Sequence, residues 1–72
     1  MFNNDIFNTV VSRTGFKKSF IIAKLGISSS AFYQKCTNRT KFSRKEEQFL
    51  KGLLNFESDE EFERTFHAED FE

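Results

Sequence analysis

One glycine, Gly26, constrains the fold of this chain more than any other residue, because it interrupts a helical apolar run. Glycine adopts a positive φ more easily than other residues do, so it can end a helix abruptly. The residues before it predict a helix over about 17–25 that stops at a tight turn. Its apolar positions, at helical spacing, are Phe20, Ile21, Ile22 and Leu25.

A second short helix is expected directly after this turn. Ser28 offers a hydroxyl that can cap a helix over about 29–36, in which Phe32 and Cys36, four residues apart, would face inward. Asn38 is expected to end this helix in the left-handed conformation. Two helices joined across a glycine-centred turn form a helix-turn-helix unit, which presents its second helix to the DNA major groove.

Three further helices complete the expected all-α fold of five helices. The first spans about residues 4–13, with Asn3 or Asn4 as its cap. Serine and glutamate at 43 and 46 form a capping box that opens a fourth helix, and those at 58 and 61 form a second box that opens a short fifth helix. The apolar positions of these three helices are Ile6, Phe7, Val10 and Val11, then Phe49, Leu50, Leu53 and Leu54, then Phe62 and Phe66.

The 72 residues are expected to form one domain, because so short a chain buries too little surface to divide. Within residues 1–72, the helix-turn-helix unit covers about 17–37, and an acidic C-terminal helix and tail cover about 58–72. Phe42 is expected to act as a lid on the core. The residues after the fifth helix, 67–72, are expected to be frayed apart from Phe71.

The net charge of zero conceals a strong segregation of charge along the chain. Residues 13–51 carry ten Lys/Arg against two glutamates, giving +8, whereas residues 52–72 carry eight Asp/Glu against one arginine, giving −7. Asp5 supplies the remaining −1. A basic segment of this density suits a polyphosphate partner, and an acidic tail disfavours nonspecific binding. The basic segment coincides with the helix-turn-helix unit, so the pattern favours nucleic-acid binding over mere solvation.

Enzymatic and metal-binding functions find little support in the sequence. His67 is the only histidine and lies in a tail expected to be frayed, so neither a histidine triad nor a metal cluster with Cys36 is expected. We expect no cofactor. One cysteine cannot form an internal disulfide, which favours a reducing cytoplasm. The longest apolar stretch, residues 20–23, is far too short to span a membrane.

A resemblance to a known family lies in residues 25–35, which read LGISSSAFYQK. This stretch resembles the turn and recognition helix of the lambda-repressor-like helix-turn-helix family of phage Cro and repressor proteins. The spacing through residues 38–42 to the capping box also fits, as does the five-helix layout over about 4–66. The short length and the acidic, Phe-bearing end look most like Cro-type switch proteins of temperate phages of Gram-positive bacteria. The resemblance implies a transcriptional regulator of a lysis–lysogeny switch, located at the nucleoid in the cytoplasm of a bacterial host.

The resemblance also implies which residues contact DNA. Ser29, Ser30 and Gln34 occupy base-facing positions, where glutamine can make a bidentate pair with adenine and serines are short, permissive partners. The same serines could simply favour a helix N-terminus. The partner would be double-stranded operator DNA, bound by a homodimer on a pseudo-palindrome. The expected phosphate contacts are Lys17, Lys18, Ser28, Arg39, Lys41, Arg44 and Lys45.

Two residues depart from the family pattern. The family usually has alanine where Ile22 stands, so the isoleucine is expected either to push the two helices apart or to shift the register onto Ala23. A frequent glutamine at the head of the first of these helices is Lys18 or Ser19 here. We therefore expect DNA binding that is weaker or less specific than that of a dedicated repressor.

The alternative function is that of an antirepressor, which binds the phage repressor and blocks its operator binding. Tyr33 or Phe71 would then supply a buried aromatic contact. The basic surface of the helix over about 29–36 could instead pair with acidic residues of the repressor. A scaffolding module that self-assembles through phenylalanines is a third class. In the antirepressor reading, the attractive acidic field would come from Glu57, Asp59, Glu60, Glu61 and Glu63.

Overall fold

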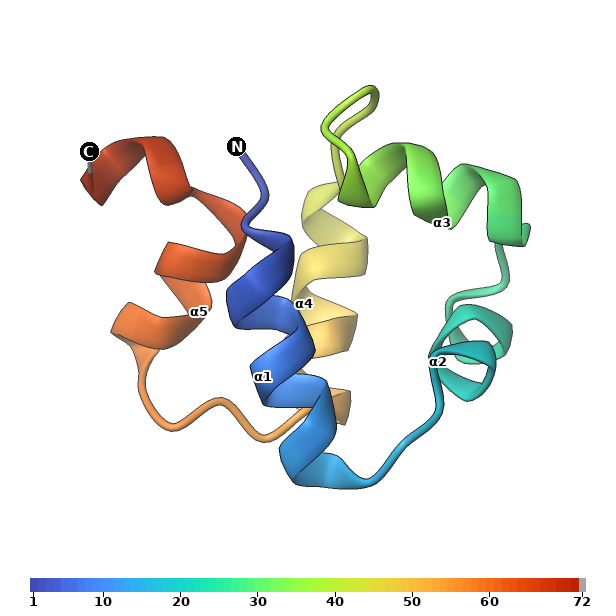
Figure 1. The fold of residues 1–72 in the computed structure, drawn as a ribbon, viewed down its shortest axis with the longest axis horizontal. Helices are drawn as coiled ribbons and strands as arrows, with labels where there is room; N and C mark the ends of the chain where they lie inside the picture. Colours follow the sequence, from blue (N-terminus) through green and yellow to red (C-terminus); the bar gives the residue numbers. More distant parts are fainter. Residues whose placement is uncertain (72) are drawn as a thin grey trace.

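The computed structural model describes residues 1–71, which form five α-helices and a short C-terminal 3₁₀ helix (Figure 1). The all-α class with five helices is confirmed, and residues 1–71 contain no strand. No helix among them is both long enough and apolar enough to cross a membrane. The helices are α1 (Asn4–Thr14), α2 (Lys18–Leu25), α3 (Ser29–Cys36), α4 (Arg44–Leu53), α5 (Asp59–Phe66) and the 3₁₀ helix η1 (Ala68–Phe71).

Most helix ends form as the sequence predicts. Gly15 after α1 and Gly26 after α2 have φ values of 75° and 73°, and Asn38 after α3 has a φ of 66°. Asn3, rather than Asn4, caps α1 by accepting a hydrogen bond from the amide of Ile6. The capping box at the start of α4 is complete, because serine and glutamate each accept a bond from the other's backbone amide.

The second predicted capping box is wrong in one half. Ser58 accepts a hydrogen bond from the backbone amide of Glu61 at 3.1 Å. The carboxylate of Glu61, however, does not return to Ser58. It accepts a bond from the amide of Glu57 at 2.9 Å and binds Arg13, because an arginine on α1 lies within reach and offers a stronger, charged donor.

Phenylalanine rings make up much of the core. In Figure 1, α1 crosses the centre of the view, with α5 on one side and α2 and α3 on the other. Phe2, which precedes α1, lies 5.2 Å from the ring of Phe7, 4.9 Å from Phe42 and 5.5 Å from Phe66. Phe42 is buried, as expected for a lid, and its ring also meets that of Phe32 edge-on at 6.3 Å. Rings at these distances attract one another beyond the effect of burial alone.

Two phenylalanines of the predicted apolar stripes lie outside the core. Phe20 on α2 and Phe49 on α4 are exposed, whereas their neighbours Ile21 and Leu50 are fully buried. Each of these pairs is adjacent in sequence, so a helix directs the two side chains about 100° apart and only one enters the core. The expected shift of register onto Ala23 is also wrong, because Ile22 is buried and Ala23 is exposed.

The predicted fraying of residues 67–71 is wrong, because the two ends of the chain bind each other; residue 72 lies outside the described residues. The amide of Ala68 donates to the carbonyl of Met1 at 2.9 Å, and the Met1 ammonium group pairs with Glu69. His67 Nε2 lies 3.1 Å from Oε1 of the buried Glu47 on α4. These contacts span sequence separations that local propensity cannot reveal.

Candidate nucleic-acid interface

The outward face of α3 is polar and its inward face is apolar. Phe32 and Cys36 are buried, as the four-residue spacing predicts, and burial raises the pKa of the Cys36 thiol to about 11 although the nearby Lys18 opposes the shift. The thiol therefore stays protonated and unreactive at neutral pH. Ser29, Ser30, Tyr33 and Gln34 are exposed.

The expected base-facing side chains have hydrogen-bonding capacity to spare. Within residues 1–71, the side chains of Ser29, Ser30 and Gln34 make no hydrogen bond to the protein. Ser28 differs, because its hydroxyl oxygen already accepts a bond from the amide of Ala31 at 3.1 Å and so caps α3. Ser28 therefore has the capping role, whereas the hydroxyls of Ser29 and Ser30 face solvent.

Asn38 fixes the loop that follows α3. Its left-handed backbone turns the chain, and its side-chain amide binds both backbone groups of Phe2: the Phe2 amide donates to Oδ1 at 2.7 Å, and Nδ2 donates to the Phe2 carbonyl at 3.1 Å. The amide of Arg39 then donates to the carbonyl of Gln34 at 2.9 Å. The loop that carries Arg39 and Lys41 is therefore ordered by the protein itself, without a ligand.

Lys35 holds the far end of this loop, a role that the sequence interpretation missed. Its Nζ donates to the carbonyl of Lys41 at 3.0 Å, pairs with Glu46 at 3.2 Å and lies 5.7 Å from the ring centroid of Phe42. Burial tends to raise the pKa of Glu46, but hydrogen bonds from the backbone of Ser43 and from Lys35 lower it overall. The sequence shows that Lys35 is next to Gln34, but it does not show the partners of Lys35, which lie six to eleven residues further along the chain.

The eleven lysines and arginines divide into two groups that occupy different parts of the fold. Four form ion pairs with carboxylates, namely Arg13, Lys35, Lys51 and Arg64. The other seven have no carboxylate within ion-pair distance in residues 1–71, and all belong to residues 17–45. They are the six basic residues expected to contact phosphates, Lys17, Lys18, Arg39, Lys41, Arg44 and Lys45, together with Lys24.

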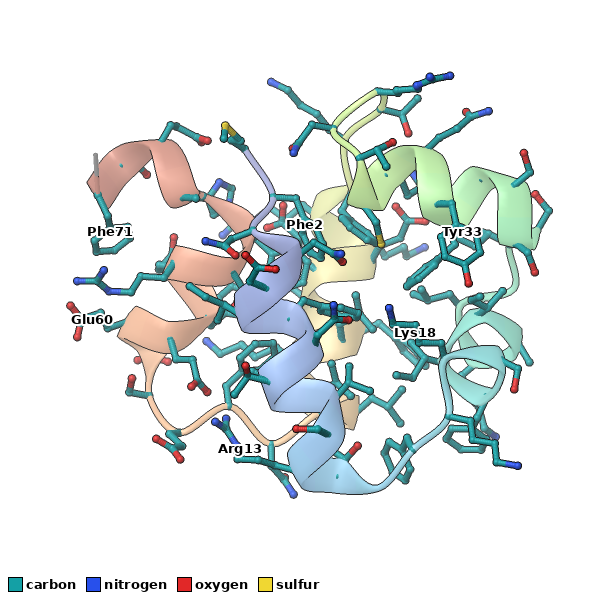
Figure 2. The ribbon with its side chains drawn as sticks, viewed as in Figure 1. Phe2, Arg13, Lys18, Tyr33, Glu60 and Phe71 are labelled. Carbon is teal, nitrogen blue, oxygen red and sulfur yellow. The ribbon has the colours of Figure 1, made fainter. Side chains whose placement is uncertain are left out.

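Six of these unpaired cations, all except Lys24, flank α3 from three elements. Lys17 and Lys18 stand at the start of α2, and Arg44 and Lys45 at the start of α4, while the loop after α3 supplies Arg39 and Lys41. Figure 2 places Lys18 and Tyr33 together on the half of the molecule that α2 and α3 form, with Glu60 and Phe71 at the opposite end. The segregation of charge along the sequence is thus also a segregation in space.

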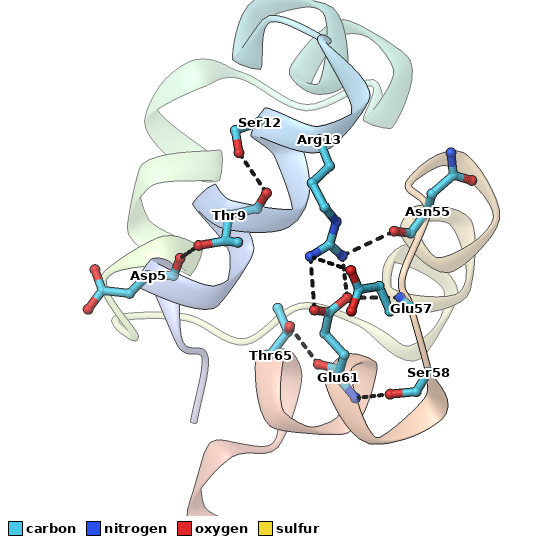
Figure 3. Close-up of polar contacts among 9 residues, drawn as sticks. All are labelled: Asp5, Thr9, Ser12, Arg13, Asn55, Glu57, Ser58, Glu61 and Thr65. Carbon is cyan, nitrogen blue, oxygen red and sulfur yellow. Dashed lines mark hydrogen bonds and ion pairs between the residues drawn. The ribbon is translucent and has the colours of Figure 1, made fainter.

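The acidic residues proposed to attract a repressor are mostly held by basic residues of the same chain. Arg13 donates to Glu61 at 3.1 Å and to the carbonyl of Asn55 at 3.3 Å, and it lies 3.5 Å from Glu57 (Figure 3). Asp59 pairs with Lys51 and Glu60 pairs with Arg64, each at close range. Of the five carboxylates, Glu63 alone has no such partner within residues 1–71. The field of this surface is correspondingly reduced.

The two aromatic residues proposed as anchors lie on different surfaces. Tyr33 is exposed on α3, with its ring edge-on to Phe32 at 5.7 Å. Phe71 on η1 is also exposed and stacks under the guanidinium of Arg64 at 4.5 Å.

No protein-family model, curated protein or solved structure matches this chain. Within residues 1–71, no group of three or more His, Cys, Asp or Glu residues is placed to hold a metal ion.

Proposed function

We propose that this protein is a small phage-type helix-turn-helix regulator of a lysis–lysogeny switch, with a lambda-repressor-like fold, that binds operator DNA alone or together with the phage repressor. The observation that carries the proposal is the set of six unpaired cations that flank α3. A polyanion releases its counterions when it meets such a surface, and this release drives binding. The free hydroxyls and amide of the α3 face supply the groups for base contacts.

In this mechanism α3 enters the major groove and the flanking cations hold the backbone on either side. The loop after α3 needs no folding on binding, because Asn38 and Lys35 already fix it. Preorganisation of this kind lowers the entropy cost of association. A dimer would place two such helices on a pseudo-palindrome about one helical turn apart.

Specificity is expected to be modest. Gln34 is the one long side chain among the three expected base contacts, and serines accept several bases. The short chain and its acidic, Phe-bearing end resemble the modulator of repression of lactococcal phages, a small protein that works together with, or against, a phage repressor. Such a role tolerates weak DNA recognition when a second protein contributes affinity.

A gel shift of the purified protein on its own promoter region tests this proposal. We expect a retarded band at low salt and micromolar protein, and a steep loss of affinity as salt is raised, since phosphate contacts dominate. Lys41→Ala combined with Arg39→Ala should weaken binding to all sequences alike. The absence of any shift at low salt would remove direct DNA binding.

The second candidate is an antirepressor that binds the phage repressor and blocks its operator binding. It is favoured by the exposed aromatic side chains that DNA binding does not require, among them Tyr33, of which 51% is exposed. A pull-down with the cognate repressor, with and without operator, separates the two candidates. A stable complex that releases operator would rank this candidate first, and failure to associate without DNA would eliminate it.

A further inference from the structure

An apolar face on α2 and α4 is left uncovered. Phe16 and Phe20 stack with their ring centroids 4.9 Å apart, and Lys24 Nζ lies 5.4 Å from the centroid of Phe20. Lys24 and Leu25 in turn line a surface hollow of about 460 Å³ together with Phe49 of α4. These contacts join five residues into one continuous surface. We call it the α2–α4 face, and it consists of Phe16, Phe20, Lys24, Leu25 and Phe49.

Exposed apolar side chains of this kind are unfavourable in water, so a binding partner that covers the α2–α4 face would be stabilised by burying them. Its three phenylalanines expose 36, 40 and 42% of their surface, in a chain whose other rings mostly fill the core. Clusters of exposed aromatic rings mark surfaces that bind another protein. Phosphates and base edges gain little from phenylalanine rings, and no residue of α3 lines the hollow. The α2–α4 face therefore calls for a partner other than the DNA that α3 would read.

The edge of the α2–α4 face is positive. Lys24 belongs to the face and Lys45 lines the same hollow, and neither has an ion-pair partner within residues 1–71. The one carboxylate in the hollow, Glu46, is already held by Lys35 at 3.2 Å. An occupant that brings its own carboxylates next to apolar side chains would satisfy both the rings and the lysines.

A second copy of this chain is a poor occupant. Two α2–α4 faces in a symmetric pair would set lysines against lysines, which is repulsive. The acidic α5 of another copy offers few free carboxylates, because Arg13, Lys51 and Arg64 already pair with three of its four, Asp59, Glu60 and Glu61. The complementary chemistry has to come from a different protein.

We propose that the α2–α4 face is the surface that binds the phage repressor, and that the repressor segment seated on it is an acidic amphipathic helix. This proposal rests on the proposed function, in which the protein contacts the phage repressor. It adds which surface makes that contact and what kind of repressor segment binds there. It moves the contact from the acidic α5 and η1 to the opposite, basic half of the molecule. It also leaves the outward side chains of α3 uncovered.

Binding of the purified full-length repressor to matched phenylalanine variants tests the assignment. Phe49→Ala and Phe20→Ala should each weaken the complex about tenfold or more, as expected for central aromatic anchors. Phe71→Ala is the matched control, since Phe71 is the same residue type and exposes the same 42% of its surface. It should leave the affinity within about twofold. All three side chains are exposed, so thermal melts of the variants should stay near that of the unsubstituted chain.

The charge of the partner is tested by Lys24→Glu, which should weaken repressor binding further than Lys24→Gln does. Operator binding of Phe20→Ala and Phe49→Ala provides an independent readout and should not change.

The outcomes separate this assignment from the proposed function. If the unsubstituted chain binds no repressor, with or without operator, repressor contact is excluded and the assignment falls with it. If it binds, but Phe71→Ala rather than Phe49→Ala weakens the complex, the repressor contact stands and the α2–α4 face is overturned. Loss of operator binding in Phe20→Ala and Phe49→Ala would assign the face to DNA instead. A concentration-dependent dimer that these variants abolish would assign it to a second copy.

Discussion

At the scale of single residues, backbone conformation and side-chain bonds combine at Asn38. The residue sits in the left-handed region with a φ of 66°, which asparagine tolerates better than most residues do. Its amide meanwhile binds both backbone groups of Phe2, thirty-six residues earlier in the chain. One side chain thus ends α3, orders the loop that carries Arg39 and Lys41, and anchors the segment that precedes α1.

Substitution of Asn38 should separate these contributions. Asn38→Gly keeps the left-handed backbone and loses only the two bonds to Phe2, at a cost of about 1–2 kcal/mol. Asn38→Ala loses the bonds and adds left-handed strain, so we expect a loss of about 2–3 kcal/mol in the free energy of unfolding. Urea denaturation of both variants measures the difference. Equal destabilisation would show that the backbone conformation contributes nothing.

Gln34 and Lys41 should differ in how their loss affects DNA binding. Gln34→Ala should relax preference at one base pair by about 1–3 kcal/mol while affinity for other sequences changes little. Lys41→Ala should weaken binding to every sequence and reduce the salt slope by about one. Competition gel shifts on single-substituted operators, repeated at several salt concentrations, distinguish the two. A uniform loss in Gln34→Ala would argue against base reading by this residue.

At the scale of elements, one arginine joins the first helix to the last. Arg13 at the end of α1 reaches Glu61 on α5 and the carbonyl of Asn55 in the segment between α4 and α5 (Figure 3). The hydrogen bond from Arg13 lowers the pKa of Glu61. A carboxyl group whose pKa is lower in the folded protein stabilises the fold above its unfolded pKa, about 4.3 for glutamate. That contribution is lost as the pH falls through the folded pKa.

The melting temperature of Arg13→Gln should follow this dependence. At neutral pH the variant should melt below the unsubstituted chain, because Glu61 loses its charged partner. In strongly acidic buffer Glu61 is protonated in both proteins, so the difference should shrink towards zero. Arg44→Gln serves as the control, since Arg44 has no carboxylate partner within residues 1–71. A difference that persists unchanged in acid would assign the effect to packing of the Arg13 stem instead.

At the scale of the whole molecule, the two ends of the chain close the fold. The Asn3 amide donates to the carbonyl of Thr65 at 2.7 Å, and the Ala68 amide donates to the carbonyl of Met1. Beneath these bonds the ring of Phe2 contacts those of Phe42 and Phe66. Met1 and the start of η1 therefore lie next to each other, near the top of the view in Figure 1.

Deletion of residues 68–72 should consequently destabilise the protein. The deletion removes the Ala68 and Glu69 contacts to Met1 and the stacking of Phe71 on Arg64. We expect a loss of about 1–2 kcal/mol, from one backbone hydrogen bond, one exposed ion pair and the stacking. Thermal unfolding followed by circular dichroism measures it. If the truncated chain had the same melting temperature as the full-length chain, the contacts of residues 68–71 would contribute nothing to stability.

The sequence by itself determined the secondary structure and the inward faces of most helices. Turn and cap chemistry is local, so Gly15, Gly26 and Ser43 could be interpreted without any knowledge of the fold. Helical spacing likewise placed Phe32 and Cys36 inside. The segregation of charge was also visible, because it needs only counting along the chain.

Only the tertiary structure decided which charges remain free and which rings stay outside. Whether Glu61 faces solvent or Arg13 depends on the packing of α1 against α5. Whether Lys35 faces solvent or braces a loop depends on where Glu46 lies. The exposed Phe20 and Phe49 were indistinguishable from core residues by hydrophobicity alone. Local patterns determine conformation over one or two helical turns, whereas ion pairing and burial are settled by contacts between segments that are distant in the sequence.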